Sequence, residues 1–96
     1  MTTQQNILSI LRSAKPALEK KYNVSGLALF GSYSRNTAVE DSDVDLMVEF
    51  NKPPGILFID LADELEELLN NKVDLVSRKA IKPAYFQHIQ PQLIYV

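Results

Sequence analysis

Residues 43–50 alternate between two kinds of side chain, and this alternation limits the possible folds more than any other part of the chain. One set of positions is mostly acidic and the other is apolar: Asp43, Asp45, Met47 and Glu49 against Val44, Leu46, Val48 and Phe50. Successive side chains of a strand lie on opposite faces, so the pattern predicts a strand with one well-buried face. Such a strand needs neighbouring strands and an apolar layer packed against it.

Helical and extended segments alternate along the rest of the chain. Apolar residues that recur at helical spacing predict helices over 4–22, 57–70 and 81–89. Short apolar runs or alternation predict strands over 27–30, 43–50 and 73–77. Pro16 is expected to kink or split the first helix, and Asn23–Gly26 is expected to be a turn. Leu68 is expected on the buried face of the helix 57–70, and Tyr85 is expected in the core. The predicted fold is α/β (α+β), with a small sheet of three to four strands and helices packed against it. We expect a mixed sheet, because residues 31–42 are too few for a full crossover helix.

Composition places residues 1–96 in a single domain. A hydrophobic fraction of 46% can fill a core, and a chain of this size buries roughly 65% of its unfolded surface. No apolar run approaches the ~18 residues of a membrane span, and the polar N-terminus predicts no secretory signal. Cysteine is absent, which excludes disulfides and thiolate metal sites, and a cytoplasmic location is the default expectation.

The net charge of −2 argues against a protein that binds nucleic acid by bulk electrostatics. We therefore expect no direct nucleic-acid binding. Nucleotides remain possible substrates, because a metal ion can supply the local positive charge.

Gly31 and Ser32 follow the apolar run 27–30 and are expected to open a short helical turn near residues 33–36. Glycine lets a ligand approach the backbone closely, and the start of a helical turn presents free N–H groups that favour phosphate. On its own, a Gly-Ser pair is more typical of an ordinary turn with a serine cap.

Three aspartates are candidate metal ligands. Asp43 and Asp45 are two positions apart on a predicted strand, so their carboxylates share a face and repel unless a cation lies between them. Oxygen ligands in this arrangement suit Mg²⁺. Asp74 is a lone acid inside the apolar strand 73–77, and it can complete a three-carboxylate cluster if that strand lies beside residues 43–50. The alternative is that all three acids simply face solvent.

The spacing of these features resembles a known family. The stretch from Leu29 to Asn36, followed by Asp41 to Leu46, is similar to the DNA polymerase beta-like nucleotidyltransferases, and to their smallest branch, the minimal nucleotidyltransferases. The later segments 72–76 and 80–83 resemble that branch too. Asn36 stands where the branch usually has glycine, and because asparagine tolerates a positive φ we expect the turn to be kept.

The resemblance implies a site and a reaction. It implies that the substrate is ATP and that Gly31 and Ser32 hold its triphosphate. It also implies that Asp43, Asp45 and Asp74 are the catalytic residues and bind two Mg²⁺ ions. Arg35 could neutralise a phosphate oxygen, or be an ordinary surface arginine.

The resemblance also implies a partner. Chains of this branch are commonly antitoxins paired with HEPN-domain toxins, which are ribonucleases, and the antitoxin transfers AMP from ATP to a tyrosine of the toxin. Two alternatives stay open. One is a non-catalytic antitoxin or binding module that acts by contact alone, and the other is a nucleotidyltransferase with a small-molecule or RNA acceptor.

Overall fold

The chain folds around a four-stranded mixed sheet in the order β3-β2-β1-β4, seen in a computed structural model that describes residues 2–96. In chain order the elements are α1 (Gln4–Tyr22), β1 (Val24–Phe30), β2 (Val44–Phe50), α2 (Leu57–Leu69), β3 (Val73–Ser77), the 3-10 turn η1 (Arg78–Ala80), α3 (Pro83–Ile89), the 3-10 turn η2 (Gln90–Gln92) and β4 (Ile94–Tyr95). Strand β2 is parallel to β3, and β1 is antiparallel to both β2 and β4. The predicted mixed sheet with packed helices is confirmed.

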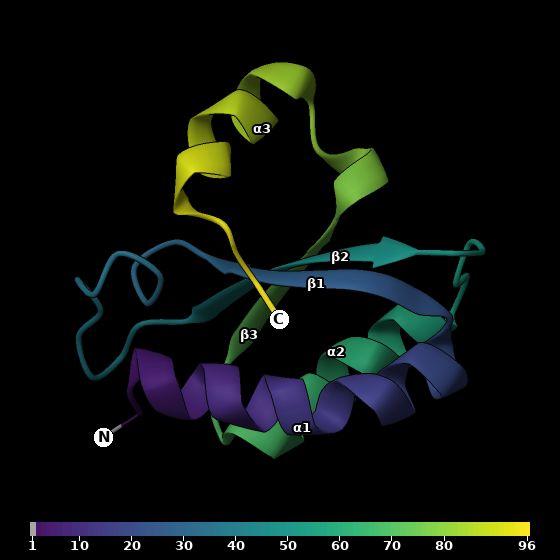
Figure 1. The fold of residues 1–96 in the computed structure, drawn as a ribbon, viewed down its shortest axis with the longest axis horizontal. Helices are drawn as coiled ribbons and strands as arrows, with labels where there is room; N and C mark the ends of the chain where they lie inside the picture. Colours follow the sequence, from purple (N-terminus) through teal and green to yellow (C-terminus); the bar gives the residue numbers. More distant parts are fainter. Residues whose placement is uncertain (1) are drawn as a thin grey trace.

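The helices cover the two faces of the sheet unequally. Helices α1 and α2 lie together on one face, and the shorter α3 lies on the other (Figure 1). The larger core is between the sheet and α1 and α2, and its fully buried side chains are Ile7, Leu11, Leu18, Val24, Leu27, Leu29, Val44, Leu46, Val48, Leu61 and Leu65. A smaller cluster under α3 contains Ala28, Phe30, Met47 and Ile89. Helix α3 therefore buries fewer side chains against its face of the sheet than α1 and α2 bury against theirs.

Asparagines end both long helices. Helix α1 begins after Thr3, whose side chain accepts a hydrogen bond from the Asn6 N–H, and ends at Asn23 with a φ of 59°. Helix α2 ends at Asn70 with a φ of 49°, as its sequence predicts. Pro16 lies inside α1 and does not split it.

Three predictions about local structure are wrong. Asn23 alone turns the chain, so β1 begins at Val24 and no turn extends to Gly26, which pairs with Glu49 in β2. Leu68 was expected on the buried face of α2 but is 38% exposed. Tyr85, expected in the core, is 49% exposed, because the seven-residue α3 buries only Ile89. Within residues 2–96, the helices are too short or too polar for any of them to cross a membrane.

Candidate active site

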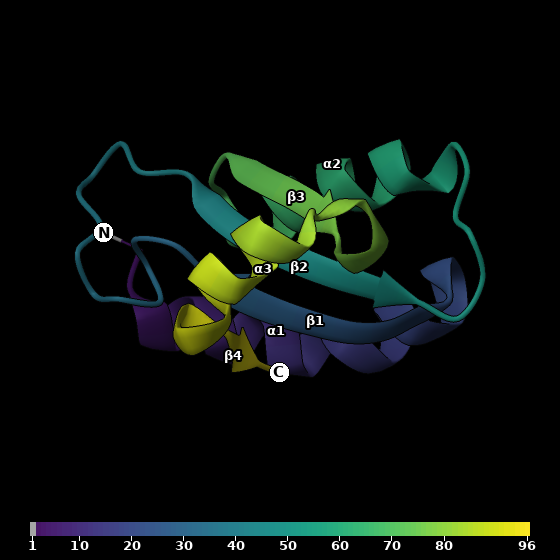
Figure 2. The ribbon, with the colours of Figure 1, turned by 90° about the horizontal axis from the view of Figure 1, so that it is seen from above.

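The predicted acidic residues lie at one end of the sheet, where β1 ends and β2 and β3 begin. Asp45 of β2 is in register with Phe30 of β1 on one side and with Asp74 of β3 on the other. Adjacent strands are about 4.8 Å apart, so Asp45 and Asp74 lie side by side on the face that α3 partly covers. Asp43 directly precedes β2, and the loop that contains it projects beyond the sheet (Figure 2). The structure thus brings β3 beside β2, as the hypothesis of a three-carboxylate site required.

The charge at this end of the sheet is predominantly negative. Asp45 is half-buried, whereas Asp43 and Asp74 are exposed. Burial raises the pKa of the Asp45 carboxyl, the charges of Asp74 and Asp43 raise it further, and the guanidinium of Arg35 opposes them. A cation at this position would relieve the repulsion.

The carboxylates form a row and not a closed cage. Within the part of the chain that the structure describes, no three His, Cys, Asp or Glu side chains lie close enough together to hold a metal ion. Their chemistry nevertheless fits Mg²⁺, which takes only one or two protein carboxylates and completes its shell with water and substrate phosphates. Asp45, together with Asp43 or Asp74 beside it, would supply those one or two carboxylates.

Gly31 packs its backbone directly against Asp45. Its φ of +77° is in the left-handed region, and a Cβ at this position would collide with Oδ2 of Asp45 and lie 2.9 Å from its Cγ. Any side chain here would therefore displace the carboxylate. Glycine at this position allows the backbone of β1 to approach the acidic row.

The residues after Gly31 form one tight helical turn. The Gly31 carbonyl accepts hydrogen bonds from the Arg35 N–H at 3.1 Å, the Ser34 hydroxyl at 3.0 Å and the Arg35 Nε at 3.3 Å. Residues 32–36 are turns and not a regular helix, and Asn36 has the positive φ, 59°, expected from the sequence. The side chain of Arg35, a candidate phosphate ligand, is exposed.

Three consecutive backbone N–H groups in this turn are free. Those of Ser32, Tyr33 and Ser34 donate to no acceptor within residues 2–96. Successive unpaired N–H groups next to a helical turn are typical of phosphate-binding sites. The turn and the acidic row together can hold a phosphate chain and its metal.

Two glutamines contact this turn, and sequence reasoning missed both. Gln92 Oε1 accepts a hydrogen bond from the Gly31 N–H at 3.1 Å, and Gln4 Nε2 donates to the carbonyls of Tyr33 at 3.1 Å and Ser34 at 2.9 Å. Both glutamines are in polar segments at opposite ends of the chain. Nothing in the local sequence distinguishes them from other surface glutamines.

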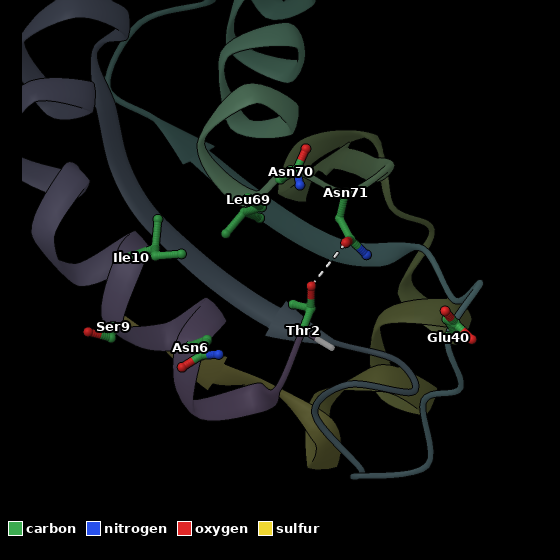
Figure 3. A pocket seen from close by; sticks show the side chains of 8 residues that line it. All are labelled: Thr2, Asn6, Ser9, Ile10, Glu40, Leu69, Asn70 and Asn71. Carbon is green, nitrogen blue, oxygen red and sulfur yellow. Dashed lines mark hydrogen bonds between the residues drawn. The ribbon is translucent and has the colours of Figure 1, made fainter.

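Asn71 is a third residue that the sequence did not reveal. Its Nδ2 donates to the Ser42 carbonyl at 3.3 Å and to the Tyr33 hydroxyl at 3.5 Å, and its Oδ1 accepts from Thr2 at 3.1 Å. Figure 3 shows the bond between Thr2 and Asn71, two of the residues that line an open hollow of about 520 Å³ near α1 and the end of α2. Asn71 therefore links the segment before Asp43 to the segment before β3.

Comparison with known families identifies the chain. Residues 11–94 match the family described as "Nucleotidyltransferase domain". The chain belongs to this family. It is therefore an enzyme of the nucleotidyltransferase class, as the acidic row and the phosphate-binding turn suggested.

Relatives of this nucleotidyltransferase cover its whole length. Protein adenylyltransferase MntA of Thermococcus cleftensis is 40% identical over 97 residues, which are 100% of this chain and 98% of the relative. A Methanocaldococcus jannaschii protein, MJ0128, provisionally named a protein adenylyltransferase, is 48% identical over 98 residues, with all of both chains covered.

Solved structures confirm the minimal nucleotidyltransferase fold. One, provisionally described as a minimal nucleotidyltransferase, superposes with a TM-score of 0.80 at 31% identity and covers 96% of this chain and 94% of its own. A toxin–antitoxin structure with AMP-PNP has a TM-score of 0.69 at 28% identity and covers 96% of this chain and 70% of that one. An MNT antitoxin complex with the tri-AMPylated HEPN toxin of Shewanella oneidensis has a TM-score of 0.60 at 26% identity, with 96% and 66% covered.

Proposed function

We propose that this nucleotidyltransferase is an antitoxin that transfers AMP from ATP to a tyrosine of a cognate HEPN ribonuclease toxin and so inactivates it. The observation that carries the proposal is the acidic row, Asp43, Asp45 and Asp74, beside a turn with three free N–H groups. The likeness to protein adenylyltransferases, and to toxin–antitoxin structures that contain AMP-PNP or an AMPylated toxin, supports the choice of nucleotide and acceptor.

The proposed reaction displaces pyrophosphate from ATP. The tyrosine oxygen attacks the α-phosphorus, the bond from that phosphorus to the bridging oxygen of the β-phosphate breaks, and pyrophosphate leaves. The hydroxyl proton passes to a carboxylate, for which Asp74 is the candidate. The N–H groups and hydroxyl of the turn hold the phosphates, and Arg35 adds positive charge beside them.

Asp43 and Asp45 are the proposed principal ligands of Mg²⁺, and Asp74 is the third. The bound metal would supply positive charge that stabilises the developing charge on the phosphates. Because Asp45 is half-buried and repelled by both neighbours, a cation bound there gains more than it would at an isolated surface carboxylate.

The test uses a double variant and a matched control. Asp43→Asn with Asp45→Asn should abolish Mg²⁺-dependent transfer of label from α-labelled ATP. The variant should remain folded, with a Tm no lower than that of the wild type. The control, Asp60→Asn with Asp63→Asn, makes the same charge change on the exposed face of α2 and should keep full transfer. Wild-type transfer by the first variant would overturn the proposed site.

The acceptor is identified by where the label goes. Cell extract incubated with α-labelled ATP and Mg²⁺ is separated into protein, RNA and small molecules, and we expect the label on a protein tyrosine. Label on RNA or a small molecule would instead support the alternative acceptors. If the double variant, co-expressed with the toxin, restored growth without adding nucleotide mass to the toxin, inhibition by contact alone would be supported.

A further inference from the structure

Two glutamine side chains from opposite ends of the chain hold the backbone of the turn. Gln92 accepts from the Gly31 N–H, and Gln4 donates to the carbonyls of Tyr33 and Ser34. We propose that Gln4 and Gln92 are positioning residues that aim the free N–H groups of this turn at the triphosphate of the nucleotide. The inference rests on the proposed function, because it needs the turn to bind phosphates.

The geometry of the peptide unit explains how a bond to a carbonyl can aim an N–H group. Each peptide is planar and trans, so its C=O and its N–H point in opposite directions. Each free N–H shares a peptide unit with the carbonyl of the preceding residue. Ser32 N–H is thus paired with the Gly31 carbonyl, Tyr33 N–H with the Ser32 carbonyl, and Ser34 N–H with the Tyr33 carbonyl. Holding each carbonyl on one side therefore presents each N–H on the other.

Gln4 reinforces the peptide that the backbone of the turn holds by its longest hydrogen bond. Backbone N–H groups later in the turn donate to the carbonyls of Gly31 and Ser32, at 3.1 Å and 2.9 Å. The Tyr33 carbonyl accepts a longer backbone bond, from the Asn36 N–H at 3.4 Å, and a shorter one from Gln4 Nε2 at 3.1 Å. Without Gln4 only the 3.4 Å bond from Asn36 holds this peptide, which can then more easily turn its carbonyl, in place of the Ser34 N–H, toward the phosphates.

Gln92 fixes the start of the turn. Strand β4 pairs with β1 only at Ala28 and Leu29, so no strand residue reaches the N–H of Gly31. The side chain of Gln92 supplies the missing acceptor. Because this bond fixes the peptide before Gly31, it also fixes the direction in which the chain leaves β1 and passes Asp45.

Replacing each glutamine by glutamate separates hydrogen bonding from charge. The two changes preserve size and add the same charge close to the same turn. Glutamate at position 4 cannot donate to the carbonyls, whereas glutamate at position 92 still accepts from the Gly31 N–H. Gln4→Glu should therefore weaken nucleotide binding, and Gln92→Glu should be close to neutral, while Gln92→Ala should weaken it.

Matched controls are available beside each position. Gln5 and Gln90 are exposed, and their side chains make no hydrogen bond within the described residues. Gln5→Glu and Gln90→Glu add the same charges without touching the turn. Gln4→Met removes the donor without adding charge, which keeps the test valid if Gln4→Glu does not fold.

The readout is the affinity of the full chain for a non-hydrolysable ATP analogue with Mg²⁺, measured by calorimetry well below the unfolding temperature. Loss of one hydrogen bond at the turn corresponds to about a 5-fold to 10-fold rise in Kd. We expect that rise for Gln4→Glu, Gln4→Met and Gln92→Ala, and less than about a 2-fold change for Gln92→Glu relative to Gln90→Glu. A purely structural role would lower the unfolding temperature and leave the Kd unchanged.

Two failures are distinguishable. If the wild type binds the analogue and the three weakened variants match their controls, this inference is overturned and the proposed function stands. If the wild type does not bind the analogue at all, the proposed function is overturned, and this inference falls with it.

Discussion

Replacing Gly31 by alanine should destabilise the protein much more than replacing Gly55, although both glycines have a positive φ. Their φ values are +77° and +57°, but a Cβ at Gly31 would collide with Asp45, whereas a Cβ at Gly55 would meet nothing within 4 Å. A left-handed conformation costs a non-glycine residue roughly 1–2 kcal/mol. Alanine recovers about 0.4–1 kcal/mol of this by restricting the unfolded chain. Gly55→Ala should therefore lower the free energy of unfolding by about 0.5–1 kcal/mol.

Gly31→Ala adds the collision to the same backbone strain. Inserting a methyl group into a filled space costs about 1–3 kcal/mol, so the total is about 2–4 kcal/mol. Each kcal/mol lowers Tm by about 4–8 °C in a domain of this size, so the two variants should differ by at least about 5 °C. Thermal unfolding followed by circular dichroism in metal-free buffer measures the difference.

A double-variant cycle tests the cause. In an Asp45→Ala background the Oδ2 and Cγ atoms are gone, and only the Cβ of residue 45, at 3.1 Å, remains close. The extra penalty of Gly31→Ala should then largely disappear. The reasoning is refuted if Gly31→Ala is no more destabilising than Gly55→Ala, or if its penalty is unchanged in the Asp45→Ala background.

Three further predictions follow from the same structure. Because the folded-state pKa of Asp45 is raised, its ionisation opposes folding, and Asp45→Asn should raise the metal-free Tm at pH 7. The difference in Tm should disappear below about pH 4, where Asp45 is protonated in both states, and thermal scans at several pH values would show this. Tyr22→Phe removes the 2.7 Å bond from its hydroxyl to Glu64 and should cost about 1 kcal/mol in urea unfolding, whereas Lys21→Ala removes only an exposed ion pair with Glu64 and should change little. Magnesium should bind weakly without nucleotide, because the carboxylates do not form a closed cage, and calorimetry showing saturation at micromolar Mg²⁺ would contradict this.

The sequence predicted those parts of the fold that are recorded in local periodicity. The alternation over 43–50 predicted β2 and the face on which Asp45 lies, and the helical spacing of apolar residues over 57–70 predicted α2. The positive φ values of Asn36 and Asn70 were also predictable, because asparagine tolerates them. The start of β1 was missed, since Gly26 is a poor strand residue and is held in the strand by its pairing with β2.

Some residues of the candidate site could be predicted from the sequence, and others could not. Acidic residues stand out inside apolar strands, so Asp45 and Asp74 could be found from sequence, and the parallel register places them side by side. Their failure to converge on one point depends on side-chain positions that spacing does not determine. Gln4 and Gln92 could not be found, because their contacts with the turn depend on how the two ends of the chain come together.

The bond between Gly31 and Gln92 also sets an order of events during protein synthesis. The two residues are 61 positions apart, and β4, which follows Gln92 directly, pairs with β1 far behind it in the chain. While the ribosome is still adding the intervening residues, β1 has an open edge and the Gly31 N–H has no acceptor. The acidic strands are made well before that. The turn after β1 therefore gains its bond from Gly31 to Gln92 only once residue 92 has left the ribosome.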